Sequence, residues 1–228
     1  MRKIIILNFV ILGICCPIHS QQKKTNDQNS CKSQFTYGDK RFCLPIIEGM
    51  TECLSNQIVK DWSQKLNAPG TTDLAFYIKN DQYENIENLE DEIIDDYFKI
   101  TAFTKLEGQN ISRSHFNDLS SALEGNMIQK KLEDVLKKIE EMGVDFTIEQ
   151  PLLLEVYTPD ENVRSMVMFA KYIMDTGAYY MINVTSLIFT KQRLFILNYT
   201  SNYQDEKSIN QAKIKSNHVV FRFVDVNK

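Results

Sequence analysis

Seven carboxylates lie within thirteen residues of one stretch of the chain, in the sequence ENIENLEDEIIDDYFK at residues 84–99. Acidic side chains at this density can hold a metal ion, supply paired carboxylates for acid–base catalysis, or form a solvated edge that a basic partner binds. The residues that we single out as candidates for binding a partner are Glu84, Glu87, Glu90, Asp91, Asp95 and Asp96.

The spacing within this stretch argues against a metal site. A calcium loop of the EF-hand type needs oxygen ligands at fixed positions around a glycine, and no glycine lies between Glu84 and Lys99. Apolar residues instead recur every three or four positions, which predicts a short amphipathic helix that leads into a strand at Asp95. We therefore expect a solvated acidic face, or an acidic docking surface for a basic protein.

Residues for other kinds of catalysis are sparse. Beyond residue 20 the only histidines are His115 and His218, and neither lies in a serine-, cysteine- or metal-dependent signature. The glycines form no phosphate-binding loop. We predict no catalytic, metal-binding or cofactor-binding residue and no cofactor. The enzymatic alternative is an envelope hydrolase that uses carboxylates such as Asp95 and Asp96.

The first residues have the pattern of a secretory signal peptide. Arg2 and Lys3 precede an apolar run of about a dozen residues, which is too short to span a bilayer comfortably. We expect residues 1–20 to be removed by cleavage between Ser20 and Gln21, and the chain to be secreted or periplasmic. A lipid anchor at Cys15 or Cys16 is the less favoured alternative, because bulky Ile14 precedes Cys15.

Three cysteines remain after this cleavage. In an oxidising compartment one pair can form a disulfide and leave the third free. We expect the pair to be Cys43 with Cys53, closing a short loop, and the alternative is that Cys31, Cys43 and Cys53 are small, partly buried thiols.

The charge of the chain restricts its partners. Loss of Arg2 and Lys3 with the signal peptide changes the formal net charge from −4 to about −6. An acidic chain without basic clusters is poorly suited to nucleic acid or to an anionic membrane surface. We expect a protein partner, no nucleic acid and no transmembrane segment, and the sequence does not predict the oligomeric state.

The hydrophobic pattern predicts one domain of the α+β class. Residues 21–34 are polar and are expected to be a disordered lead, followed by a single domain over residues 35–228. Strands and helices alternate irregularly along that domain, which favours an antiparallel meander flanked by helices over βαβ units. The expected helices are 55–67, 112–124, 127–143 and one through 209–212, which a terminal helix or strand follows; the expected strands are 72–79, 95–105, 151–157, 163–174, 178–189 and 193–201.

The order of elements resembles the PsbP-like α/β/α sandwich of small secreted proteins. The features that carry the resemblance are LPIIEGM before the first helix, the long helix at 127–143, and the meander MINVTSLIFTKQRLFILNYTSNYQDEKSI that leads into a C-terminal helix. The resemblance covers most of residues 43–223. It implies a binding or assembly factor without chemistry, by analogy of fold alone.

The sequence therefore favours a secreted or periplasmic, non-enzymatic protein that binds another protein. An immunity protein against a basic toxin is a specific version of this hypothesis, because it would also have an acidic surface and no catalytic residues. The alternatives are the carboxylate-dependent hydrolase and a small-ligand carrier, which would need a deep pocket.

Overall fold

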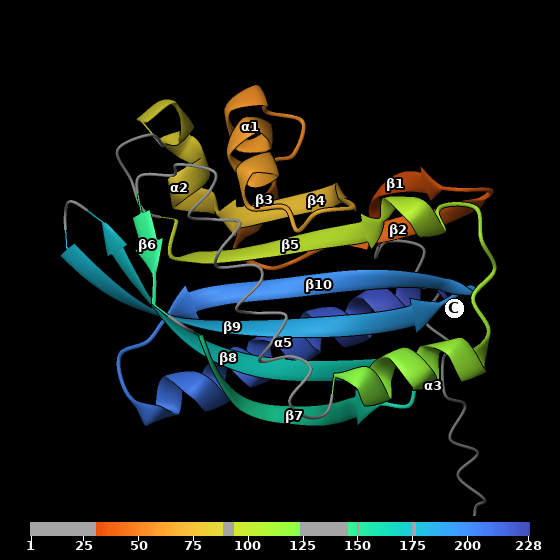
Figure 1. The fold of residues 1–228 in the computed structure, drawn as a ribbon. Coiled ribbons are helices and arrows are strands. Elements are labelled where there is room, and N and C mark those ends of the chain that lie inside the picture. The colour runs from red at the N-terminus through yellow and green to blue at the C-terminus, as the bar shows by residue number, and fades with distance from the viewer. Residues whose placement is uncertain (1–30, 89–93, 124–145, 150, 175–176) are drawn as a thin grey trace, which may run out of the picture.

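The computed structural model describes residues 31–88, 94–123, 146–149, 151–174 and 177–228. They form an antiparallel sheet with helices on both faces, so the expected α+β class is confirmed (Figure 1).

The sheet has eight strands in the order β3–β4–β5–β10–β9–β8–β6, and β7 pairs with β8 as well. The four consecutive strands β7 to β10 confirm the expected meander. The bounds of the strands are β3 Met50–Glu52, β4 Thr71–Lys79, β5 Asp96–Phe103, β6 Phe146–Ile148, β7 Leu152–Asp160, β8 Val163–Met174, β9 Gly177–Thr190 and β10 Arg193–Asn202.

Both faces of the central strands are buried, and this explains their nearly continuous apolar sequences. On β10, Phe195 and Leu197 point into the main core beneath α5 (Glu206–Val226). Leu194 points to the opposite face, where it packs near Phe116 of α3 (Arg113–Ala122). Successive side chains of a strand alternate between faces, so one strand contributes to two cores.

Helix α5 is a single helix of 21 residues, where the sequence led us to expect a short helix and then a second element. It begins at a capping box in which the Asp205 side chain accepts from the Lys207 and Ser208 amides. Its buried residues include Val219, Val220 and Phe223, which recur at helical spacing and pack on the sheet. The helix therefore closes one face of the molecule.

The remaining helices are shorter. Helix α1 (Gln57–Lys65) packs Val59 and Trp62 on the face opposite α5, against Phe76 of β4. Helix α2 (Asn80–Glu84) and the 3-10 turn η1 (Ile86–Asn88) follow β4, and η2 (Thr104–Leu106) follows β5. The acidic stretch thus begins as two short helical segments, where one amphipathic helix was expected. The expected helix at 127–143 lies outside the described residues.

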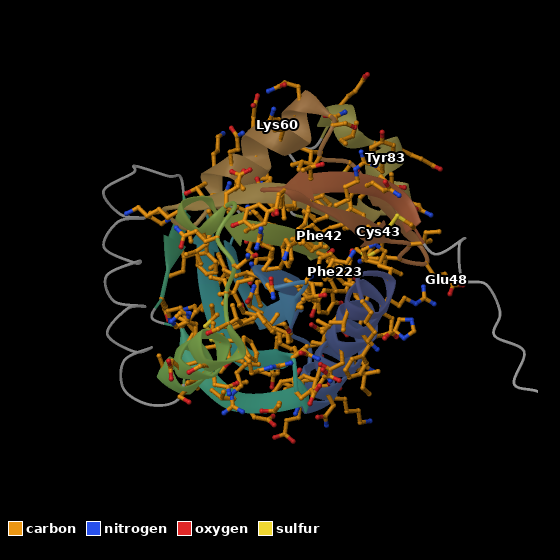
Figure 2. The ribbon with its side chains drawn as sticks, turned by 90° about the vertical axis from the view of Figure 1, so that its right-hand side faces the viewer. Phe42, Cys43, Glu48, Lys60, Tyr83 and Phe223 are labelled. Atoms are coloured by element: carbon orange, nitrogen blue, oxygen red, sulfur yellow. A yellow bond between two sulfur atoms is a disulfide. The ribbon has the colours of Figure 1, made fainter. Side chains whose placement is uncertain are left out.

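A separate two-stranded hairpin of β1 (Cys31–Tyr37) and β2 (Lys40–Pro45) lies beside α5 (Figure 2). Phe42 packs against Phe195, which in turn packs against Phe223, in the main core. The expectation that residues 21–34 are disordered is wrong for 31–34, because β1 begins at Cys31 and pairs with β2.

The expected disulfide between Cys43 and Cys53 is also wrong. Cys31 is bonded to Cys43, with 5.2 Å between their α-carbons. The hairpin brings these two residues together because Cys31 and Cys43 lie near opposite positions of β1 and β2. Cys53 is a buried free thiol next to β4, and its Sγ donates to the Phe76 carbonyl at 3.3 Å.

Candidate functional site

The structure divides the acidic stretch into two parts with different surroundings. Glu84 at the end of α2 and Glu87 in η1 are exposed, as is Asp81 nearby on α2. None of these three carboxylates forms an ion pair with a lysine or arginine of the described residues. We call Asp81, Glu84 and Glu87 the acidic face. Glu90 and Asp91 lie outside the described residues.

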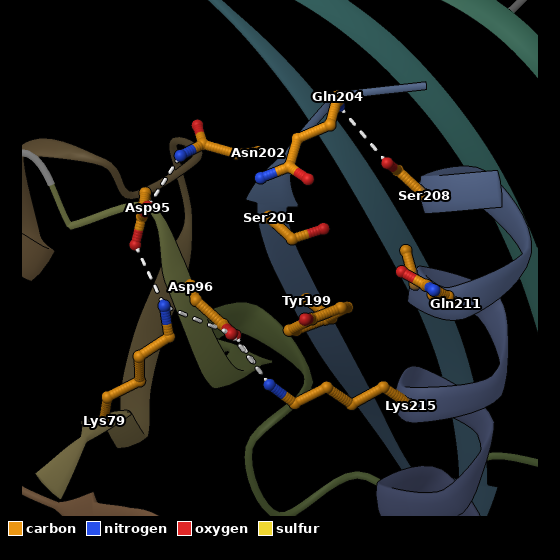
Figure 3. Close-up of a pocket in the computed structure, with 11 residues that line it drawn as sticks. Lys79, Asp95, Asp96, Tyr199, Ser201, Asn202, Gln204, Ser208, Gln211 and Lys215 are labelled. Carbon is orange, nitrogen blue, oxygen red and sulfur yellow. Dashed lines mark hydrogen bonds and ion pairs between the residues drawn. The ribbon is translucent and has the colours of Figure 1, made fainter. Parts of the chain in front are cut away.

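Asp95 and Asp96, at the start of β5, lie instead in a polar pocket with two lysines (Figure 3). Lys79 Nζ lies 3.3 Å from Asp95 Oδ1 and 3.6 Å from Asp96 Oδ2. Lys215 Nζ donates to both carboxylate oxygens of Asp96, at 2.8 and 2.9 Å. The Asn202 amide donates to Asp95 Oδ2 at 2.6 Å. Two carboxylates and two ammonium groups leave this cluster with no net charge.

Four elements position the cluster, and the register of the sheet explains how they meet. Ser201 of β10 pairs with Asp96, and Ile78 of β4 pairs with Tyr97. Lys79 and Asn202 are therefore brought to the same end of the sheet as the two aspartates. Lys215 reaches them from α5, where its ammonium group lies 5.0 Å from the centre of the Tyr199 ring.

The pocket has a volume of about 310 Å³. It lies between the ends of β4, β5 and β10 and the first turns of α5, and its side chains carry hydroxyl, amide, carboxylate and ammonium groups. Besides the two aspartates and two lysines, its lining residues are Tyr199, Ser201, Asn202, Gln204, Ser208, Gln211 and Ala212.

The surroundings of the pocket shift the pKa of Lys79 and of Tyr199. Burial lowers the pKa of Lys79, but the carboxylates of Asp95 and Asp96 raise it more, so the pKa lies above its usual value. Burial raises the pKa of Tyr199, and the negative charge of Asp96 and a hydrogen bond to it raise this pKa further. The tyrosine is therefore a neutral donor to a carboxylate that two lysines also contact.

This arrangement is poorly suited to carboxylate catalysis. A general acid of the glycosidase type needs a carboxyl group that is free to give a proton to the substrate, whereas Asp95 and Asp96 are each held in an ion pair with a lysine. The structure also shows no group of three or more potential metal ligands among the described residues.

A second ion pair is buried on the face of the sheet beneath α1. Lys99 Nζ lies 3.2 Å from Asp73 Oδ1 and donates to the Ser63 carbonyl at 2.6 Å, and both charged side chains are almost fully buried. Burial lowers the pKa of Lys99, and Asp73 opposes this effect. The contacts tie α1 to the sheet, and we assign them a structural role.

Sequence reasoning selected the two aspartates of the pocket but not their partners. Lys79, Lys215 and Asn202 are far apart in the sequence and lie in no motif. Only the strand register and the position of α5 bring them together, so no local signal could have identified them. The two histidines lie on the exposed surfaces of different helices, His115 on α3 and His218 on α5.

No family model matches the chain, and no curated protein matches it. Several chains of solved structures are similar in shape, among them the following two. One is the Saccharomyces cerevisiae Ran-binding protein Mog1p, with a TM-score of 0.34, 10% identity, and coverage of 82% of this chain and 86% of that chain. The other is a point mutant of the protein Mog1, with a TM-score of 0.36, 10% identity, and coverage of 86% and 92%.

A similarity with TM-scores this low does not indicate what this chain does. These two structures are Mog1 proteins, and the PsbP-like resemblance of the sequence stays a prediction. Among the described residues, no helix has the length and apolar character needed to cross a membrane.

Proposed function

We propose that this chain is an exported, non-enzymatic domain that acts by binding a basic protein through its acidic face. In this proposal the signal peptide of residues 1–20 directs the chain to the periplasm or the medium. An immunity protein that neutralises a basic toxin is the specific version.

The observation that supports the proposal is that the carboxylates of the acidic stretch differ in whether they form ion pairs. Asp95 and Asp96 form ion pairs with lysines, whereas the three carboxylates of the acidic face form no ion pair with a cation of the described residues, although Asp81 lies near enough to Lys79 to help raise its pKa. Exposed carboxylates outside ion pairs produce a negative potential that attracts a positively charged surface. The lysines beside Asp95 and Asp96 weigh against the alternative of a carboxylate-dependent hydrolase.

The test is affinity capture of residues 21–228, tagged at the C-terminus and expressed in the native host. Bound proteins are eluted at low and at high salt and identified by mass spectrometry. We expect one stoichiometric protein that leaves at high salt, because salt screens exposed charges over about 10 Å at 0.1 M.

A matched pair of variants locates the binding surface. Glu84→Lys reverses a charge on the acidic face, and Glu161→Lys makes the same change at an exposed residue in the turn between β7 and β8, far from α2 (Figure 1). The proposal requires Glu84→Lys to lose the partner while Glu161→Lys keeps it. Equal capture by the two variants, or no partner at either salt concentration, would overturn the proposal.

A further inference from the structure

A groove of about 790 Å³ lies between the hairpin β1–β2 and the first half of β4, apart from the acidic face and the polar pocket. Ser33, Gln34 and Phe35 of β1 line one side, and residues 71–74 of β4 line the other. Helix α1 forms part of the wall through residues that include Lys60, and Asn67, which follows the helix, also lines the groove. Two strands thus face the same groove.

The β1 side of the groove presents free main-chain groups. Gln34 lies opposite Cys43 in the hairpin. Opposed residues in an antiparallel pair either exchange both hydrogen bonds or exchange none. The Cys43 amide donates to Asn227 Oδ1 at 2.7 Å, and its carbonyl accepts from Asn227 Nδ2 at 2.9 Å, so Cys43 does not bond to Gln34. The N–H and C=O of Gln34 therefore point away from β2.

The β4 side is an incomplete sheet edge. Strand β3 pairs only with Tyr77–Lys79, and the last contact on that edge is the Cys53 amide, which donates to the Phe76 carbonyl at 2.8 Å. Within the described part of the chain, no strand pairs with residues 71–74 on the side away from β5, although the Thr71 amide already donates to the Ala68 carbonyl at 3.2 Å. A row of unpaired strand groups is a template for another strand.

The side chains of the groove specify what kind of strand fits. Four apolar residues line it, namely Phe35, Leu44, Leu54 and Leu74. Two charged side chains of opposite sign, Glu52 and Lys60, balance each other, and Asp73 is paired with Lys99. Asn67 also lines the groove, and its buried Oδ1 has no hydrogen-bond donor among the described residues. The groove offers apolar contacts and main-chain hydrogen bonds without net charge.

We propose that this groove binds an extended, uncharged peptide segment of a partner protein by strand addition. The segment takes the position of a strand between β1 and β4, where its main chain bonds to Gln34 and to the β4 edge. Alternate side chains of the segment are apolar and lie against Phe35 and Leu74. This goes beyond the acidic face, because binding here depends on main-chain hydrogen bonds and is insensitive to salt.

The probe is a phage-displayed library of random peptides, selected on the folded chain of residues 21–228 at high salt, where the acidic face is screened. We expect enriched peptides with alternating apolar residues and little charge. Enrichment of basic peptides only, or no enrichment at all, would overturn the proposal.

The matched variants are Gln34→Pro and Gln34→Ala. Proline removes one outward N–H without breaking a bond of the hairpin, whereas alanine keeps the N–H. We expect a synthetic copy of the enriched peptide to bind Gln34→Pro at least about fivefold more weakly than Gln34→Ala, the loss of about one hydrogen bond. Equal affinities for the two variants contradict the proposal.

Amide hydrogen exchange on the unmodified chain gives a readout that does not depend on how the variants fold. The bound peptide should slow exchange at Gln34 and in residues 71–74. Protection confined to the acidic face, together with loss of binding in Glu84→Lys, would reject the groove and support the proposed function instead. Protection at Gln34 with unchanged binding by Glu84→Lys would support the groove alone.

Discussion

The three cysteines beyond residue 20 have different surroundings, and these determine their reactivity. Cys31 and Cys43 form a disulfide that joins the two strands of the hairpin. Cys53 is buried in the small core formed with Val59, Phe76 and Ile78. Burial, and after it the nearby charge of Glu52, raise the pKa of its thiol to about 12.

We therefore expect Cys53 to be inert in the folded protein. The thiolate is the reactive species, and a thiol with this pKa is almost fully protonated at about pH 8. A thiol reagent should label Cys53 only after the chain is unfolded, and a non-reducing peptide map should show Cys31 joined to Cys43. Fast labelling under native conditions, or a fragment that joins Cys43 to Cys53, would contradict this.

The positions of the cysteines in the sequence do not specify which of them form the disulfide. Cys43 and Cys53 are close in sequence, and this made their pairing the natural expectation. The actual pairing depends on the register of β1 against β2, and it also draws residues 31–34 into a strand. A polar segment such as CKSQ carries no hydrophobic periodicity, so its place in a hairpin could not be read from its composition.

At the level of elements, Asn227 joins the end of α5 to the hairpin. This residue is fully buried. Its side chain bonds to both main-chain groups of Cys43 and donates to the Phe223 carbonyl at 2.9 Å. Its own carbonyl accepts from Thr190 Oγ1 at 2.8 Å. The side chain and main chain of this one residue thus hold α5, β2 and β9 together.

We predict that Asn227→Ala lowers the free energy of unfolding by about 1–3 kcal/mol, because it leaves main-chain groups of Cys43 without partners. The midpoint of urea unfolding measures the effect. Asp225→Ala is the matched control, since Asp225 lies on the same helical turn but its ion pair with Lys228 is exposed. Its effect should stay within about 0.5 kcal/mol, and an equal loss in both variants would show that the bonds to Cys43 contribute little.

Elements with strong periodicity were predictable, and short ones were not. The strands from β7 to β10 and helices α1 and α3 lie where the apolar patterns of the sequence indicated. The three-residue strands β3 and β6 carry too few residues for any pattern and exist because longer strands pair with them. In the candidate site, Asp95 and Asp96 were found as acidic residues, but their lysines depended on register and helix position.

The buried tyrosines should make the whole molecule less stable at alkaline pH. Burial raises the pKa of several phenols above the ordinary value of about 10, most strongly in Tyr77, Tyr172 and Tyr199. Above about pH 10 the unfolded chain loses these protons while the folded chain keeps them. The unfolded state then binds fewer protons, so the stability falls as the pH rises. Lys99 acts in the opposite direction, because burial lowers its pKa, but it is a single group.

We expect the midpoint of urea unfolding to be lower at about pH 11 than at about pH 9. The absorbance of tyrosinate at these buried positions should rise together with unfolding and not before it. Equal midpoints, or early ionisation of most tyrosines in the folded state, would contradict the burial of these phenols.

The charge distribution of the whole molecule bears on its partner. The ion pairs of the polar pocket cancel locally, whereas the acidic face keeps its charge in a chain whose formal net charge is already negative. A partner steered by this field should associate rapidly at low salt and more slowly as salt is added. The dissociation rate, which depends on short-range contacts, should change much less.

The most direct test of this account is the association rate of the captured partner, measured as a function of ionic strength for the unmodified chain and for the double variant Glu84→Gln, Glu87→Gln. Loss of two charges from the acidic face should slow association at low salt and flatten its dependence on ionic strength, while dissociation stays nearly the same. Equal dependence on ionic strength for the two chains would contradict the claim that the acidic face binds the partner.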